Sequence, residues 1–413
     1  MQRQKGWQTA GVLGMMLLSV ASMPPLPTLV GQAQIQPVTP PNACSEQPGQ
    51  TFERLTRDLI YRSQRYIRDR QFNLAVRSLD RALQTVTTVK DPFSKTDLVA
   101  SIAGQSGEQP STLEQLVQQA TTPQQRATLL DLLSKVTKAT QTLAGEYGVI
   151  NTKRAILVQL AAYYTVLEQP DQARSRLDQA RQLLKSLQGD GFGLIASPVA
   201  QGYTTLGDTQ TAIALLDQAV QRTQMMKTNN LDYLADIFST IAVAYASAGS
   251  EAKAVQTTQQ IKVATIKART LAQIAKQAAQ TGSPQATRIL AQAQAQTKAI
   301  PAASRSDALS QIALTYGYLK EWDLALKAIA PIQSAEIKIQ TLADLASISD
   351  RLNHPANEAK PLSELVTIAR KMSFYDSDTL IRKIFAQYLA NGQYGLAEIL
   401  HQFQQGVAKE GKI

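Results

Sequence analysis

A short pattern recurs along this chain and limits the folds available to it. In each copy an aliphatic residue and an Ala precede a Tyr by four and three positions, a Gly often follows the Tyr by four, and a second Ala follows by nine. We call the Tyr position the anchor, and the clearest copies centre on Tyr203, Tyr245 and Tyr316. The aliphatic residue and the anchor are one helical turn apart, so both face the same side of a helix.

The spacing of the copies indicates a stack of similar units. Seven anchors are separated by steps of 33 to 42 residues, and an eighth copy lies upstream at Tyr66; the seven are Tyr164, Tyr203, Tyr245, Ala278, Tyr316, Ser349 and Tyr388. Periods of about 20 to 50 residues are typical of solenoids, because one unit cannot bury its own apolar face and must pack on its neighbours. The sequence therefore predicts an all-α fold, an α-solenoid of stacked antiparallel helix pairs.

Small residues mark where the helices should touch and end. An Ala three positions before the anchor and another nine after it would let two helices approach closely, and a larger side chain there should overpack the contact. Gly207, Gly249, Gly282 and Gly392 follow their anchors by four positions. Glycine tolerates the left-handed conformation that closes a helix, so we expect the first helix of each pair to end there.

The run of anchor, Gly, aromatic residue and Ala resembles the tetratricopeptide repeat (TPR) unit. Tyr388, Gly392, Tyr394 and Ala397 carry the resemblance most fully, whereas the variable step and the non-aromatic anchors Ala278 and Ser349 depart from the family unit. The resemblance implies a TPR-like superhelix whose first helices line a concave groove for peptides or partner helices. By distance from each anchor, the implied groove residues are Asp236, Ser239, Arg269, Lys276, Asp307, Ser310, Tyr318 and Arg382.

Composition agrees with a helical repeat protein. The 413 residues are 44% hydrophobic and only 6% aromatic, and they lack the alternating β-branched pattern of strands. A solenoid grows linearly, so this length does not require several domains. We expect residues 51–413 to form one TPR-like α-solenoid, with an irregular segment at residues 91–150 where the repeat pattern is lost.

The first 33 residues have the order of a secretory signal. Arg3 and Lys5 precede an apolar run at residues 10–23, and the small-residue site Gly31-Gln32-Ala33 follows. The run is shorter than the roughly 20 residues that span a bilayer. The sequence predicts export, with cleavage after Ala33 and a periplasmic or other extracytoplasmic location; an uncleaved signal that tethers the protein to the membrane is the alternative.

Residues 34–50 are rich in Pro, Gln and small polar residues, which predicts a disordered tether. The only cysteine, Cys44, lies in this segment, so no intramolecular disulfide can form. The thiol could pair between chains or remain unpaired.

Positive charge is concentrated in the first repeat. The formal net charge is +10, and residues 51–82 contain eight arginines against four acidic residues. Arg54, Arg57, Arg65 and Arg68 share one side of the expected helix, opposite an apolar side that includes Leu55. This side could dock on a polyanion, or it could be a solvated face with ion pairs four residues apart, such as Asp58 with Arg62 and Arg65 with Asp69.

Helix signals continue through the irregular segment. Residues 94–103 predict a short helix, Ser111 to Glu114 read as a capping box, and Thr122-Pro123 as a helix cap followed by Pro in the first turn. The segment is either a distorted repeat or an insertion on one rim. Residues 189–193 contain three glycines but lack the Lys-Ser/Thr of a nucleotide site, so we expect an interhelix loop.

The sequence predicts no catalytic, cofactor or metal site. His354 and His401 are the only histidines, and neither a metal-binding motif nor a nucleophile motif accompanies them. We expect His354 in an interhelix turn and His401 on a repeat helix. These features predict an exported, non-enzymatic scaffold that binds another protein or a peptide in the cell envelope, and no nucleic acid. The alternative is binding to an anionic glycan or a membrane surface through the basic first repeat.

Overall fold

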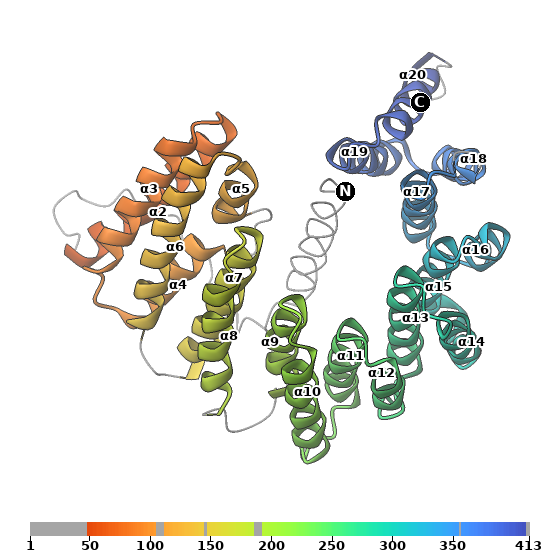
Figure 1. Cartoon of the computed structure of the whole chain (residues 1–413). Helices are drawn as coiled ribbons and strands as arrows, with labels where there is room; N and C mark the ends of the chain where they lie inside the picture. Colours follow the sequence, from red (N-terminus) through yellow and green to blue (C-terminus); the bar gives the residue numbers. More distant parts are fainter. Residues whose placement is uncertain (1–47, 105–110, 144–146, 186–191, 355–356, 410–413) are drawn as a thin grey trace, which may run out of the picture. The chain divides into compact units, whose positions relative to one another are not determined.

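The computed structural model describes residues 48–104, 111–143, 147–185, 192–354 and 357–409. These residues form helices and turns and no strand (Figure 1). The signal segment 1–33, Cys44 and most of the expected tether and glycine loop lie outside the described residues. The chain divides into two compact units, residues 1–215 and 216–413, and the boundary between them falls inside one helix.

Unit 1 contains nine helices within the described residues, the last of them only in part. They are α2 (Pro48–Arg68), α3 (Phe72–Val86), α4 (Pro92–Ala103), α5 (Thr112–Gln119), α6 (Pro123–Gln141), α7 (Tyr147–Val166), α8 (Pro170–Lys185), α9 (Phe192–Thr205) and the start of α10 (Thr209–Gln224). α2 begins at Pro48, inside the range 34–50 that the sequence assigned to a tether, and Pro is tolerated in the first turn of a helix. Phe192 and Gly193, expected in a loop, are the first residues of α9, where Phe192 is buried.

Unit 2 contains the remaining helices in regular pairs. After the end of α10 come α11 (Leu231–Ser247), α12 (Glu251–Thr258), α13 (Ala264–Gln280), α14 (Ala286–Thr297), the short 3₁₀ helix η1 (Ala302–Ser304), α15 (Ser306–Tyr318), α16 (Trp322–Ile329), α17 (Ala335–Arg351), α18 (Ala359–Ala369), α19 (Phe374–Ala390) and α20 (Tyr394–Lys409). Each odd-numbered helix from α11 to α19 packs on the even-numbered helix that follows it. We call the member of each pair that comes first in the sequence the first helix and the other the second helix.

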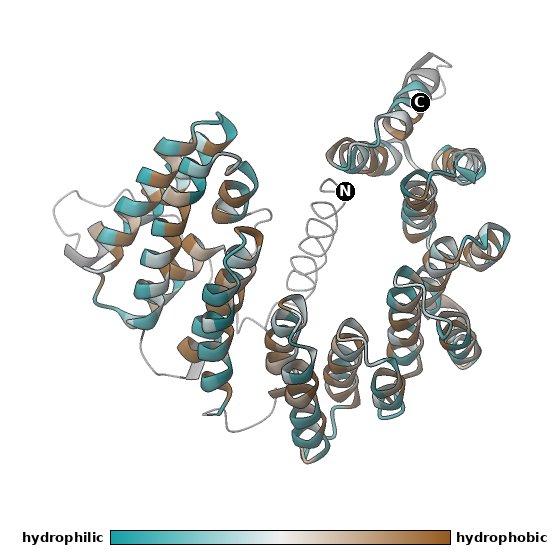
Figure 2. Ribbon diagram, in the orientation of Figure 1, coloured by the Kyte–Doolittle hydropathy of each residue, from teal (hydrophilic) through white to brown (hydrophobic). Residues whose placement is uncertain are grey.

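Successive first helices also pack on one another. In unit 2, α13 contacts α11 and α15, and α17 contacts α15 and α19. Each helix carries hydrophobic and hydrophilic bands, as expected of an element that buries one side against its neighbours (Figure 2). The predicted class is confirmed: the fold is a TPR-like, all-α array of antiparallel helix pairs.

The small residues lie where the pattern predicts helix contacts. All the Ala residues on either side of the anchors are at most 2% exposed: Ala161, Ala200, Ala242, Ala275, Ala313 and Ala346 before them, and Ala173, Ala212, Ala254, Ala325 and Ala397 after them. In the last pair the residue three positions before the anchor is Phe385, whose ring lies 6.1 Å from that of His401 on α20.

Every anchored first helix ends in the same backbone motif. The residue four after the anchor has a positive φ in all eight repeats, and the amide five after it donates to the anchor carbonyl over 2.7 to 2.9 Å. These are the features of a Schellman motif, which closes a helix with a left-handed residue. Four of these residues are the predicted glycines; the other four are Arg70, Glu168, Lys320 and Asn353, with φ between 56° and 63°.

Lys320, whose backbone has the left-handed conformation, allows a prediction about stability. We expect Lys320→Gly to raise the free energy of unfolding by about 0.5 to 1 kcal/mol, because an L-residue with a side chain is strained in this conformation and glycine is not. Lys327→Gly, at an exposed position inside α16, should instead lower it by about 1 kcal/mol. Urea unfolding of both variants measures the difference, and two changes of the same sign would contradict the assigned role of Lys320.

Two anchors connect neighbouring pairs by a second kind of contact. The Tyr203 hydroxyl donates to Asp178 Oδ1 over 2.5 Å, and the Tyr245 hydroxyl donates to Asp217 Oδ1 over 2.6 Å. Each aspartate lies fourteen residues after the preceding anchor, on a second helix. Burial is the largest cause that raises the pKa of both tyrosines, so each phenol remains a hydrogen-bond donor.

The irregular segment is a distorted pair. α4 contacts α2 and α7, while α6 contacts α3, α4 and α7, so α4 and α6 occupy the places of a first and a second helix, with α5 inserted between them. The predicted caps are present: Ser111 accepts from the Glu114 amide, and Thr122 forms a capping box with Gln125. α4 begins at Pro92, two residues before the predicted start, because Asp91 caps it.

A buried tyrosine holds the inserted helix. The Tyr163 hydroxyl on α7 lies 3.0 Å from Ser111 Oγ and 3.3 Å from the carbonyl oxygen of Ala103. Gly104 ends α4 at φ 95°, and a Cβ at this position would clash with Ser111 and Tyr163. The glycine is therefore required both by the backbone conformation and by the close approach.

Candidate interaction surface

The first helices of unit 2 carry one continuous line of polar side chains. Positions nine, five and two before the anchor and two after it lie on the same side of a helix, because their separations of four, three and four residues follow its period. We call this line the polar strip. We include in the polar strip the adjacent side chains that form hydrogen bonds with its members. The residues are Asp236 and Ser247 on α11, Arg269, Lys276 and Gln277 on α13, Asp307 and Tyr318 on α15, Gln340, Asp344 and Arg351 on α17, and Gln387 on α19.

At one end of the polar strip, side chains of α11 meet side chains of α13. Arg269 Nη2 lies 3.8 Å from Asp236 Oδ1, and the Gln277 amide donates to Ser247 Oγ over 3.2 Å. Burial raises the pKa of Asp236, against the opposing effect of Arg269. The sequence had placed Asp236 and Arg269 at the same surface, and the structure pairs them.

In the middle of the polar strip, two cations flank an aromatic ring. Lys276 Nζ lies 5.4 Å from the centroid of the Tyr318 ring, within the range of a cation–π interaction. From the next first helix, Arg351 Nη2 lies 3.4 Å from the Tyr318 hydroxyl. Lys276 and Tyr318, both predicted, are thus brought together on adjacent helices, and Arg351 joins them.

At the far end, a half-buried carboxylate is held by two amides. Asp344 Oδ1 accepts from Gln340 Nε2 over 3.1 Å and from Gln387 Nε2 over 2.9 Å. Gln340 also donates to Gln387 Oε1 over 3.1 Å. Burial raises the pKa of Asp344, while these two amides and the charges of Lys276 and Arg351 act in the opposite direction. The amides and the nearby cations therefore favour the charged carboxylate.

Two predicted groove residues belong to helix contacts instead. Ser239 is 8% exposed, and its Oγ lies 2.6 Å from Thr270 Oγ1 on the next first helix. Ser310 Oγ accepts from Thr341 Oγ1 over 2.8 Å. Both serines lie six positions before an anchor, and on α11 and α15 this position faces the next first helix rather than solvent. The repeated 31-residue spacing between each serine and its threonine was the signal for this contact.

The other two predicted residues are exposed. Asp307 lies in the first turn of α15, and Arg382 on α19 pairs with Asp378 of the same helix over 2.6 Å. By its register Asp307, nine positions before Tyr316, falls on the polar strip, whereas Arg382, six positions before Tyr388, does not. Conversely, Gln340, Asp344 and Arg351 were not predicted, because their repeat has Ser349 as its anchor and the pattern is weakest there.

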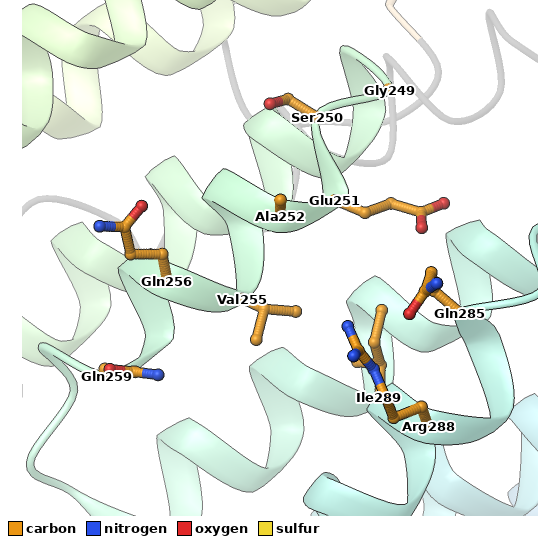
Figure 3. A pocket seen from close by; sticks show the side chains of 10 residues that line it. All are labelled: Gly249, Ser250, Glu251, Ala252, Val255, Gln256, Gln259, Gln285, Arg288 and Ile289. Carbon is orange, nitrogen blue, oxygen red and sulfur yellow. The ribbon is translucent and has the colours of Figure 1, made fainter.

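A shallow groove lies on the second helices of unit 2. It runs between α12 and α14 and is lined by Val255, Gln256 and Gln259 from one helix and by Gln285 and Arg288 at the other, with Val255 pointing toward Arg288 (Figure 3). Its volume is about 600 Å³, Ile289 forms part of its floor, and Glu251 at one end accepts from Ser283 Oγ over 2.8 Å. None of the predicted groove residues lines it, since those residues lie on first helices.

Both histidines lie where the sequence predicted, and His401 is on the repeat helix α20. His354 follows α17 in the turn to α18, and its ring lies 6.0 Å from that of Trp322. Among the described residues, no group of three or more His, Cys, Asp and Glu side chains comes together as a metal site would require. Within the same part of the chain, every helix is too short or too polar to cross a bilayer.

No protein-family model matches the sequence, and no curated protein matches it. Among solved structures, the chain is similar to the nearly identical TPR-like repeats of a kinesin light chain from Podosopora anserina, with 20% identity and a TM-score of 0.34 over 53% of this chain and 97% of that one. Ton1535 from Thermococcus onnurineus NA1 has 11% identity and a TM-score of 0.31, over 84% of this chain and 98% of that one.

A circular tandem repeat protein has 11% identity and a TM-score of 0.22, over 87% of this chain and 90% of that one. The class of protein is defined by the helix pairs themselves, by the buried Ala at their crossings and by the eight identical helix ends. It is a helical-repeat protein of the TPR-like type.

Proposed function

We propose that the protein is a non-enzymatic scaffold that binds another protein or a peptide along the polar strip of unit 2. The observation that carries the proposal is the continuity of the strip across five successive first helices, α11 to α19. Fixed amide, carboxylate and guanidinium groups of this kind supply both donors and acceptors at regular intervals.

The spacing of the helices suits an extended chain. Packed helices lie about 8 to 10 Å apart, and an extended peptide advances about 3.3 Å per residue. A peptide that crosses the strip would therefore meet a new first helix about every third residue. Gln340 and Gln387 could exchange their mutual hydrogen bond for bonds to its backbone, while Lys276 and Arg351 would favour an acidic side chain beside Tyr318.

We further propose that this work takes place outside the cytoplasm, in the cell envelope. The support is the basic, apolar and small-residue order of residues 1–33. An exported and processed protein would begin at Gln34, and a retained first segment would mean that the signal acts as an anchor. Mass spectrometry of the N-terminus of protein from the native host decides between these two.

Photocrosslinking tests the binding surface. A photoreactive residue in place of Tyr318, in the middle of the strip, should capture a specific partner in intact cells, and Arg351→Ala should reduce that capture. The same residue in place of the exposed Ala291 on α14 should capture nothing specific. Capture only from a probe at Arg288 would show that the partner binds the groove between α12 and α14. No capture from the polar strip would exclude the proposed surface.

A further inference from the structure

One side of α2 is an exposed row of arginines around a tyrosine. Arg54, Arg57, Tyr61, Arg65 and Arg68 are spaced by three, four, four and three residues, so they lie on one side of the helix. All five are exposed, and Tyr61 is 58% exposed. We call this side the arginine face.

Two of the four arginines on the arginine face, Arg65 and Arg68, are not neutralised by carboxylates of the described residues, whereas Arg54 and Arg57 each have a partner. Arg57 forms ion pairs with Glu53 over 3.1 Å and with Asp97 over 2.9 Å. Arg65 and Arg68 form no ion pair within the described part of the chain, and the expected pairs of Asp58 with Arg62 and Arg65 with Asp69 are absent there. The two arginines in the last turn are favoured by the helix dipole instead.

An exposed aromatic side chain on α4 accompanies the arginines, since Phe93 is 62% exposed. The exposed Phe52 and Leu55 of α2 do not flank the arginines, because at 100° per residue they lie about 180° and 120° around the helix from the centre of the arginine face. Leu55 was predicted opposite the arginines, and it lies away from them, although it is 43% exposed. Phe93 lies one helical turn before Asp97, the residue that pairs with Arg57, so it is on the side of α4 that faces the arginine face.

This combination has the chemistry of an interfacial helix. Guanidinium groups bind phosphate oxygens in a bidentate manner, and aromatic and aliphatic side chains enter the boundary between headgroups and acyl chains. We propose that unit 1 docks on an anionic phospholipid bilayer through the arginine face, with α2 lying along the membrane surface. The exposed rings of Tyr61 and Phe93 favour a bilayer over a soluble acidic chain, which would satisfy the charges but leave these rings in water.

Vesicle flotation tests this docking with the full-length protein. The probe is phosphatidylcholine vesicles with about one third phosphatidylglycerol, compared with pure phosphatidylcholine. The protein should float with the anionic vesicles only, and less as salt is raised. Each cation close to such a surface strengthens binding about fivefold, so the double variant Arg65→Gln/Arg68→Gln should weaken binding about 30-fold.

A matched control removes the same charge elsewhere. Lys262→Gln/Lys298→Gln changes two exposed lysines of unit 2 and should leave flotation unchanged. Tyr61→Ser should weaken binding without altering its salt dependence, since it removes no charge. Equal losses in the two double variants, binding to neutral vesicles, or binding to soluble dextran sulfate without binding to vesicles would each overturn the bilayer proposal. The polar strip plays no part in this test, so its outcome is independent of the proposed function.

Discussion

The substitution Ala313→Leu is expected to lower the free energy of unfolding by about 1 to 3 kcal/mol. Ala313 is fully buried on α15, three positions before the anchor Tyr316. α15 packs against α13, α16 and α17 at once, so this helix has little room to move aside. The added branched side chain would force the neighbouring helices apart or adopt a strained rotamer.

Two control substitutions distinguish the effect of crowding a helix contact from the effect of the residue change itself. Ala291→Leu makes the same chemical change at an exposed position on α14, and Arg65→Ala truncates an exposed side chain on α2. Both should change the free energy of unfolding by less than about 0.5 kcal/mol. Urea unfolding followed by circular dichroism measures all three, and equal effects at the two alanine positions would contradict the assignment of Ala313 to a helix contact.

The substitution Tyr203→Ala is expected to have the largest effect, a loss of about 3 to 5 kcal/mol. Tyr203 is among the largest side chains that are fully buried, and it fills the space between α9 and α8. Its removal leaves a cavity that the surrounding helices can only partly close. Tyr203→Phe, which loses only the hydrogen bond to Asp178, should cost about 1 kcal/mol.

The part of the chain that Tyr203→Ala destabilises, and not only the size of the loss, tests the repeat architecture. In repeat arrays each unit contacts its neighbours, so a lost contact destabilises locally. Hydrogen exchange should show reduced protection in α8 and α9 and unchanged protection in α17. Tyr375→Ala, at a tyrosine that is 79% exposed, serves as the matched control and should have no measurable effect. Uniform loss of protection from α8 to α17 would contradict this local behaviour.

The helix ends show how far a sequence pattern can be trusted. The glycines predicted four of the left-handed positions correctly, because a residue without a side chain prefers such a site. Arg70, Glu168, Lys320 and Asn353 adopt the same conformation without that preference. There the hydrogen bonds of the motif and the packing of the next helix outweigh a strain of about 1 to 2 kcal/mol, which single-residue preferences do not reveal.

The candidate surface was predictable only in part, for a similar reason. Counting positions from each anchor correctly assigned Asp236, Arg269, Lys276 and Tyr318 to one surface. In the structure Asp236 pairs with Arg269, and Lys276 lies beside the Tyr318 ring. Counting could not distinguish a position that faces solvent from one that faces the adjacent first helix. Ser239 and Ser310 are short enough to fit between helices, where each bonds to a threonine. A register within one helix does not fix the angle at which the next helix crosses it.

The sequence alone determined the periodic features of this protein: helix pairs, small residues at their crossings, and helix ends four residues after each anchor. These follow from local geometry, since the period of the helix decides which side chains share a side and which positions can turn. The tertiary structure decided that α4 and α6 form a distorted pair and that Gln340, Asp344, Arg351 and Gln387 extend the polar strip. Both depend on contacts between residues far apart in the chain, which exist only once the helices pack.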